Sequence, residues 1–143
     1  MTAGQALPER LRGFLETRHE ILEAYLFGSH ATGLARPHSD VDVAVYLSRP
    51  DPPASVFGYV ADLTAELMSA LGMDRVDVIV LNEASPLLYH RVLRDGIRVF
   101  SRDLRATTTR EGRALSRYCD YVPQLGKIDA AHRARTERGD FGR

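Results

Sequence analysis

Apolar residues recur along the chain with two different periods, which predicts that helices and strands follow one another. A recurrence every three or four residues is typical of a helix, and β-branched and apolar residues in alternation are typical of a strand. The expected helices lie from near Pro8 to Arg18, at 54–71, at 86–95 and at 103–122, with one further turn after Gly28. The expected strands lie at 23–27, 41–47, 75–81 and 97–101. This order predicts an α/β domain in which a small mixed sheet packs against helices.

The C-terminal part of the chain carries few residues that can form a core. The apolar positions of the last predicted helix are Leu104, Leu115, Tyr118 and Val122. Cys119 is expected to be a small buried residue beside this stripe. The sequence is then polar and rich in arginine, which is typical of a segment that folds poorly by itself. We therefore predict one domain over residues 1–122, followed by a basic tail over 123–143 that is either disordered or ordered by a partner.

Length and composition fit one globular domain. The chain has 143 residues, of which 44% are hydrophobic and 27% charged, which is ordinary for a folded protein. The single cysteine excludes an internal disulfide framework and a cysteine-based zinc site. No apolar run is as long as the roughly 18 residues of a membrane span, and the N-terminus lacks the pattern of a signal peptide. We expect a cytoplasmic protein that does not contact a membrane.

Charge is balanced in total and uneven along the chain. The net charge is zero, but residues 1–90 hold 6 basic and 12 acidic side chains, whereas residues 91–143 hold 13 and 7. The balance argues against a dedicated nucleic-acid-binding protein, which usually has a strong basic excess. The asymmetry predicts either an acidic site early and a basic surface late, or two solvated faces of a mixed surface.

Three aspartates form the acidic half of a candidate site. Asp40 and Asp42 stand two residues apart at the start of a predicted strand, so both carboxylates leave the same face. Like charges repel, and hard divalent cations such as Mg²⁺ prefer oxygen ligands. Asp77 lies on a later strand that is expected to neighbour the first pair. Three such carboxylates can hold two metal ions that clamp the attacking and leaving oxygens of a phosphoryl transfer.

Gly28 and Ser29 supply the complementary half of this candidate site. They follow a predicted strand and precede a predicted helical turn. Glycine lets the backbone approach a phosphate closely, and free amides at the start of a helix favour an anion. The Ser29 hydroxyl adds a hydrogen-bond donor. A nucleoside triphosphate is therefore expected beside the metal ions.

These residues stand in stretches that resemble a known family. LFGSHATGLARPHSDVDVAVYL resembles the signature of the minimal nucleotidyltransferases of the DNA-polymerase-β-like superfamily, and the aspartate in RVDVIVL matches its third carboxylate. LLYHRVLRDGIRVFSRD and the Tyr-Cys-Asp-Tyr-Val-Pro helix end are similar to the MNT-type antitoxins of HEPN/MNT toxin–antitoxin pairs. The resemblance covers about residues 20–123 and implies a polymerase-β-like nucleotidyltransferase fold.

The resemblance also implies a reaction and a partner. It implies an Mg²⁺-dependent nucleotidyltransferase that transfers AMP from ATP to a tyrosine hydroxyl of a cognate HEPN ribonuclease toxin and so neutralises it, within a hetero-oligomer. Gly28 and Ser29 would bind the triphosphate, whereas Asp40 and Asp42 would bind the metal. Asp77 would complete the metal site and assist deprotonation of the acceptor. No direct nucleic-acid partner is expected.

Some positions near the motif leave their roles open. Thr32 stands where many relatives carry arginine, and His38 where an acidic or amide residue is common; neither change removes a carboxylate. Arg36 and Arg75 either contact phosphate or pair with the acidic cluster. His30 follows Ser29 directly and either contacts phosphate or, as we expect, lies at the surface.

Two other functions compete with the antitoxin enzyme. A small-molecule nucleotidyltransferase, such as one acting on aminoglycosides, usually needs a further domain for the acceptor, and only about 40 residues follow the fourth predicted strand. A non-catalytic antitoxin would neutralise the toxin by covering it. The aspartates argue against pure binding, because a binding surface has no need to crowd carboxylates.

Overall fold

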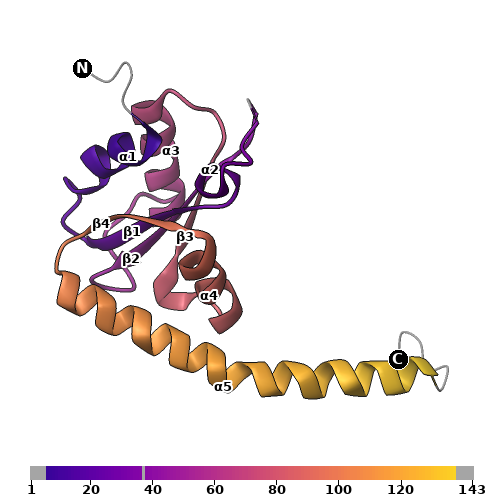
Figure 1. The fold of residues 1–143 in the computed structure, drawn as a ribbon. Coiled ribbons are helices and arrows are strands. Elements are labelled where there is room, and N and C mark those ends of the chain that lie inside the picture. The colour runs from indigo at the N-terminus through magenta and orange to yellow at the C-terminus, as the bar shows by residue number, and fades with distance from the viewer. Residues whose placement is uncertain (1–5, 37, 138–143) are drawn as a thin grey trace.

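The computed structural model describes residues 6–36 and 38–137, with side chains described up to residue 124. Four strands form one mixed sheet in the order β3-β2-β1-β4, in which β1 pairs antiparallel with β2 and β4, and β2 pairs parallel with β3 (Figure 1). The strands are β1 (Ile21–Phe27), β2 (Val41–Leu47), β3 (Val76–Val80) and β4 (Ile97–Ser101). The helices are α1 (Leu7–Leu15), α2 (Ser29–Thr32), α3 (Tyr59–Leu71), η1 (Leu81–Glu83), α4 (Pro86–Asp95) and α5 (Leu104–Glu137). The predicted α/β class is confirmed.

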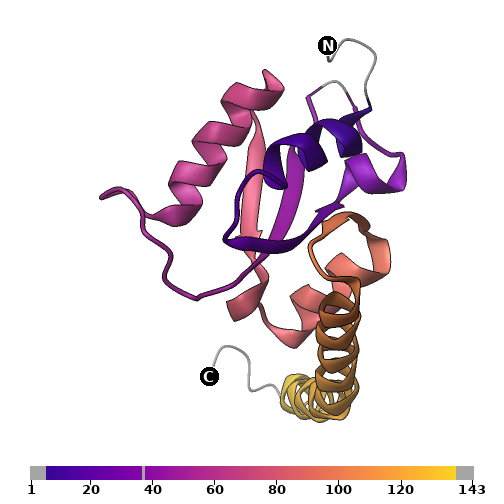
Figure 2. The same ribbon diagram turned by 90° about the vertical axis from the view of Figure 1, so that its left-hand side faces the viewer.

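Helices cover both faces of the sheet. Val41, Val43 and Val45 point to the face covered by α1 and α3, where the leucines of these helices complete the larger core. Ala44, between them on β2, points to the opposite face, where it packs with residues of α4 and α5 in a second core. Figure 2 shows α5 almost end on beneath this second face. Asp42 alternates with the valines, so it belongs to the α4 and α5 face.

Helix α3 begins five residues later than its apolar stripe predicted. The carboxylate of Asp62 accepts a hydrogen bond from the Ser55 backbone N–H at 2.8 Å, and the Gly58 N–H donates to the Ser55 carbonyl at 3.1 Å. These bonds hold the preceding residues in a turn, and Gly58 has a φ of +93°, outside the helical region. Val56, which was expected on the buried stripe, is therefore 94% exposed.

Helix α5 continues to Glu137 and does not end near Val122 as predicted. Pro123 lies inside it; proline removes one backbone hydrogen bond and crowds the preceding turn. Figure 1 shows α5 changing direction near its middle and then extending beyond the sheet, as an interior proline would cause. The division into a domain over 1–122 and a tail over 123–143 stays a prediction, and residues 138–143 lie outside the described residues.

The face of α5 that packs on the sheet is not the predicted apolar stripe. Leu104, Leu115 and Val122 are exposed, and so is Cys119, contrary to expectation. In the part of α5 whose side chains the structure describes, residues 104–124, the buried positions are Thr107 and Ala114. A helix can bury a polar face where each polar group finds a partner, which an apolar-periodicity argument does not detect.

The polar face of α5 finds its partner in Glu23 of β1, whose side chain is 0% exposed. Its carboxylate accepts two hydrogen bonds from the Arg110 guanidinium, at 2.7 and 2.6 Å, and one from the Thr107 hydroxyl at 2.9 Å. A further hydrogen bond between β1 and α5 lies beside this cluster, where the Tyr25 hydroxyl donates to the Glu111 carboxylate at 2.6 Å. These bonds fix α5 on the sheet.

Arg110→Ala should destabilise the protein by about 3 kcal/mol or more, because it leaves a charged carboxylate buried without its partner. Chemical denaturation measures this free energy of unfolding. Arg113→Ala, on the same helix and exposed, is the control and should change it by less than about 0.5 kcal/mol. Equal losses in both variants would show that the buried pair has no special role.

Candidate active site

A tight turn after β1 places backbone against a carboxylate of β2. Gly28 has φ +75° and ψ −156°, a region that essentially only glycine occupies. A Cβ at this position would overlap the Asp42 Oδ2 atom. The N–H groups of Ala31 and Thr32 donate to the Gly28 carbonyl at 3.0 and 3.2 Å, which builds the short helix α2 from Ser29 onward. The predicted Gly-Ser turn therefore lies against Asp42 of the predicted carboxylate pair.

Strand register brings two of the three aspartates together. Asp42 pairs with Phe27 of β1 on one side and with Asp77 of β3 on the other. Because residues paired across parallel strands project to the same face, both carboxylates lie on the α4 and α5 face. Asp42 is half-buried, whereas Asp77 is exposed, as is Asp40 just before β2.

Electrostatics couple the three carboxylates. Burial raises the pKa of Asp42 above its ordinary value, and the negative charges of Asp77 and Asp40 raise it further, while His30 opposes the shift. Each negative charge therefore makes ionisation of Asp42 less favourable. A cation placed among these groups would relieve that repulsion.

The donor set fits a hard divalent cation by its chemistry, since all three side chains offer carboxylate oxygens. Within residues 6–36 and 38–124, however, no three His, Cys, Asp or Glu side chains converge closely enough to surround one ion. Asp42 and Asp77 form the paired part of the set, and Asp40 lies exposed in the loop just before β2. The assignment of all three as metal ligands stays a prediction.

One contributor to this site, His30, was expected at the surface but is half-buried. The ring Nε2 of His30 lies 3.2 Å from the Ser39 carbonyl, so it connects α2 to the residue before Asp40. Its position directly after Ser29 was the only available signal. His30 is a positioning residue by this contact, and it also lies close enough to Asp42 to affect its pKa.

The flanking residues of the motif make mainly backbone contacts. The Arg36 N–H donates to the Ser39 hydroxyl at 2.8 Å, and the Arg75 carbonyl accepts from the Val41 N–H at 2.9 Å. Both arginine side chains are exposed, as is His38. The Thr32 hydroxyl lies 3.4 Å from backbone carbonyls of its own turn. Phosphate contacts by Arg36 and Arg75 stay a prediction.

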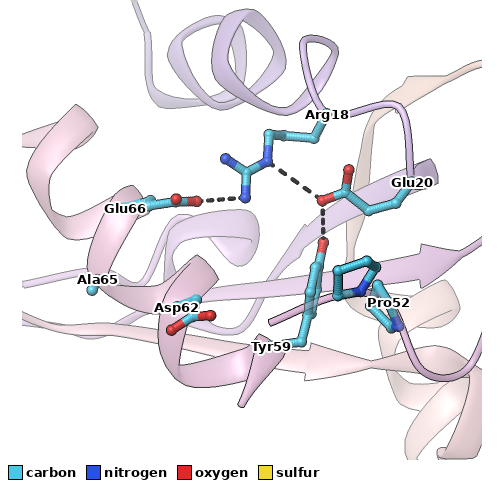
Figure 3. Close-up of a pocket in the computed structure, with 8 residues that line it drawn as sticks. Arg18, Glu20, Pro52, Tyr59, Asp62, Ala65 and Glu66 are labelled. Atoms are coloured by element: carbon cyan, nitrogen blue, oxygen red, sulfur yellow. Dashed lines mark hydrogen bonds and ion pairs between the residues drawn. The ribbon is translucent and has the colours of Figure 1, made fainter. Parts of the chain in front are cut away.

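A pocket of about 600 Å³ lies elsewhere, beside α3 and the loop before it (Figure 3). Arg18 lies between Glu20 and Glu66 and pairs with both, and the Tyr59 hydroxyl donates to Glu20 at 2.8 Å. The predicted site residues take no part in lining it. Since these charges already pair with one another, the pocket offers less to an ionic ligand than the carboxylates at the start of β2.

The fold and the Gly-Ser and aspartate arrangement define a small nucleotidyltransferase domain. A family model, polymerase beta nucleotidyltransferase, matches residues 9–105. The chain belongs to this family, which confirms the predicted fold and superfamily. A comparison with curated proteins gives no match.

Solved structures with the same fold include chains from toxin–antitoxin complexes. A chain from a toxin–antitoxin complex with AMP-PNP is 23% identical, with a TM-score of 0.72 over 89% of this chain and 99% of that chain. A chain from a mutant MntA-HpeT complex is 25% identical, with a TM-score of 0.70 over 90% and 99%. A chain from a tri-AMPylated Shewanella oneidensis HEPN toxin in complex with MNT antitoxin is 23% identical, with a TM-score of 0.64 over 88% and 97%. In the described part of this chain, no helix is long and apolar enough to cross a membrane.

Proposed function

We propose that this protein is an antitoxin that transfers AMP from ATP to a tyrosine hydroxyl of a cognate HEPN toxin in the cytoplasm. The observation that carries the proposal is the contact of the Gly28 turn with Asp42, which stands in register with Asp77. Family membership supports nucleotidyl transfer. The partner is inferred from the toxin–antitoxin complexes that share this fold.

Each half of the site would hold one part of the substrate complex. The Gly28 backbone, which a side chain would obstruct, and the Ser29 hydroxyl would receive the triphosphate. Asp40, Asp42 and Asp77 would hold Mg²⁺ through carboxylate oxygens. When bound, Mg²⁺ supplies positive charge that stabilises the negative charge that develops on the phosphates.

In the proposed transfer, one bond to phosphorus forms, one breaks, and a carboxylate of the site accepts the proton. The acceptor hydroxyl oxygen forms a bond to the α-phosphorus, and the bond from that phosphorus to the bridging oxygen breaks, so pyrophosphate leaves with its electron pair. A tyrosine hydroxyl has a pKa near 10 and is protonated at neutral pH. We assign its proton to the carboxylate of Asp77, which is exposed on the sheet face and can reach an acceptor from another chain.

Neutralisation by binding alone is the second candidate, and the shape of α5 favours it. This helix extends beyond the sheet (Figure 1) and exposes Leu104, Leu115 and Val122. Exposed apolar side chains on a projecting helix are typical of a surface that docks another protein. Docking and transfer are compatible, because the enzyme must hold its acceptor.

Intact-mass spectrometry of the HEPN protein from the same genome separates these candidates. After incubation with this protein, ATP and Mg²⁺, we expect the toxin mass to increase by one or more AMP units and its ribonuclease activity to fall. Chelation of Mg²⁺ should abolish the mass increase. A stable complex that inhibits the toxin without any mass increase would contradict the transfer and support binding alone.

A further inference from the structure

An arginine-lined pocket of about 170 Å³ lies between α5 and the end of the sheet remote from Asp42. We call it the arginine pocket. Its polar lining consists of Tyr46, Asn82, Tyr89, Arg110, Arg113 and Arg117. On β2, Tyr46 lies four residues beyond Asp42 on the same face, a separation of about 13 Å, and the buried Ala44 lies between them. The arginine pocket is thus separate from the candidate active site.

The arginine pocket carries an uncompensated positive charge. Arg110 is neutralised by Glu23, and its guanidinium lies 4.9 Å from the centre of the Tyr46 ring. Arg113 and Arg117 follow at helical spacing and face the same side of α5. Neither forms an ion pair or a side-chain hydrogen bond with the other side chains described here. Two positive charges therefore remain available for a ligand.

Tyr89 gives a second, independent indication that the arginine pocket holds a ligand. Its side chain is only 4% exposed, and its hydroxyl is buried without a hydrogen-bond partner among the described residues. Buried hydroxyl groups nearly always have a partner, because an unsatisfied one is costly. The pKa of Tyr89 is raised, mainly by burial, so the hydroxyl stays protonated at neutral pH and can donate a hydrogen bond. Together, a buried donor and two free guanidinium groups call for an anionic acceptor.

We propose that the arginine pocket binds a phosphate-sized oxyanion, with Arg113 and Arg117 supplying charge and the Tyr89 hydroxyl donating a hydrogen bond. Arginine is suited to this ligand because its planar fork binds two oxygens at once. The volume excludes a whole nucleoside, since drug-sized ligands occupy pockets of about 300–1,000 Å³. The ligand is therefore a free phosphate ion or the phosphate of a monoester whose remainder stays outside. This site does not depend on the proposed AMP transfer.

Titration of the full chain with inorganic phosphate tests the site. Calorimetry and thermal unfolding are performed at constant ionic strength with a chelator present, so that carboxylates without metal repel phosphate from the catalytic end of β2. We expect phosphate to bind and to raise the unfolding temperature. Arg113→Gln and Arg117→Gln should each weaken binding about tenfold or more, because each removes a charge-assisted hydrogen bond. The exposed Arg12→Gln on α1 is the control and should bind as the wild type does.

Tyr89→Phe separates a binding role from a structural one. This variant should bind phosphate more weakly, yet it should unfold at no lower temperature without phosphate, because it removes only an unpaired hydroxyl. AMP in a parallel titration identifies the source: tighter binding of AMP that Arg113→Gln and Arg117→Gln weaken indicates a monoester, and tighter binding of inorganic phosphate indicates a free ion. Binding that is equal in the wild type and all pocket variants, or no binding of either probe, would overturn the proposal.

Discussion

Asp42→Asn should abolish nucleotide transfer without destabilising the fold. The loss of activity should be about a thousandfold or more, because a bound metal contributes several kcal/mol to transition-state stabilisation and each 1.4 kcal/mol or so is a factor of ten. Incorporation of labelled AMP into the toxin measures the activity. Asp51→Asn, at an exposed carboxylate in the loop after β2, is the control and should keep full activity.

The stability of this variant follows from the pKa of Asp42. Burial and the charges of Asp77 and Asp40 raise that pKa in the folded state above its value in the unfolded chain. The folded state therefore holds the proton more tightly, and the wild type loses stability as the pH rises from the ordinary aspartate pKa through the raised one. At neutral pH the charged Asp42 is destabilising, so Asp42→Asn should unfold at the same temperature as the wild type or a higher one.

Addition of Mg²⁺ gives the complementary result. A ligand that binds only the folded state raises the unfolding temperature, so Mg²⁺ should stabilise the wild type and should do so much less in Asp42→Asn. If the variant unfolds at a clearly lower temperature without Mg²⁺, Asp42 has a structural role and the metal assignment loses its support. Full activity in the variant would have the same consequence.

The sequence predicted the catalytic end of the sheet better than the rest because its signals are local. The bounds of β2 and the helical turn after Gly28 agree with the structure, since the first depends on alternation and the second on one glycine. The alternation that defines β2 also fixes the face of Asp42. The pairing of Asp42 with Asp77 could not be derived from local signals, because strand register is set by contacts between segments far apart in the chain.

The position of α5 could not be predicted from periodicity. Its packing depends on Glu23, which lies more than 80 residues earlier and reads as a polar position on a strand. A buried carboxylate that pairs with arginine reverses the usual rule that the apolar stripe faces the core. The apolar residues of α5 are consequently left exposed, which is the property that a docking helix requires.

Gly28→Ala should destabilise the protein and abolish transfer, whereas Gly58→Ala should only destabilise it. Both glycines have positive φ and extended ψ, and an alanine in this region costs about 1–3 kcal/mol. A Cβ at Gly58 would meet open space, but a Cβ at Gly28 would overlap the Asp42 carboxylate. The added methyl group must therefore displace either the Gly28 turn or Asp42, and both belong to the candidate site.

The two alanine variants thus share the same kind of backbone strain, but only in Gly28→Ala does the added methyl group meet the Asp42 carboxylate. Denaturation should show a larger loss of stability for Gly28→Ala, and labelled AMP incorporation should fall to the level of Asp42→Asn in this variant alone. Ordinary activity in Gly28→Ala would mean that the close approach of this turn to Asp42 serves folding only. A parallel loss of activity in Gly58→Ala would instead attribute the effect to global destabilisation, because a Cβ at that glycine would meet no atom of the described residues within 4 Å.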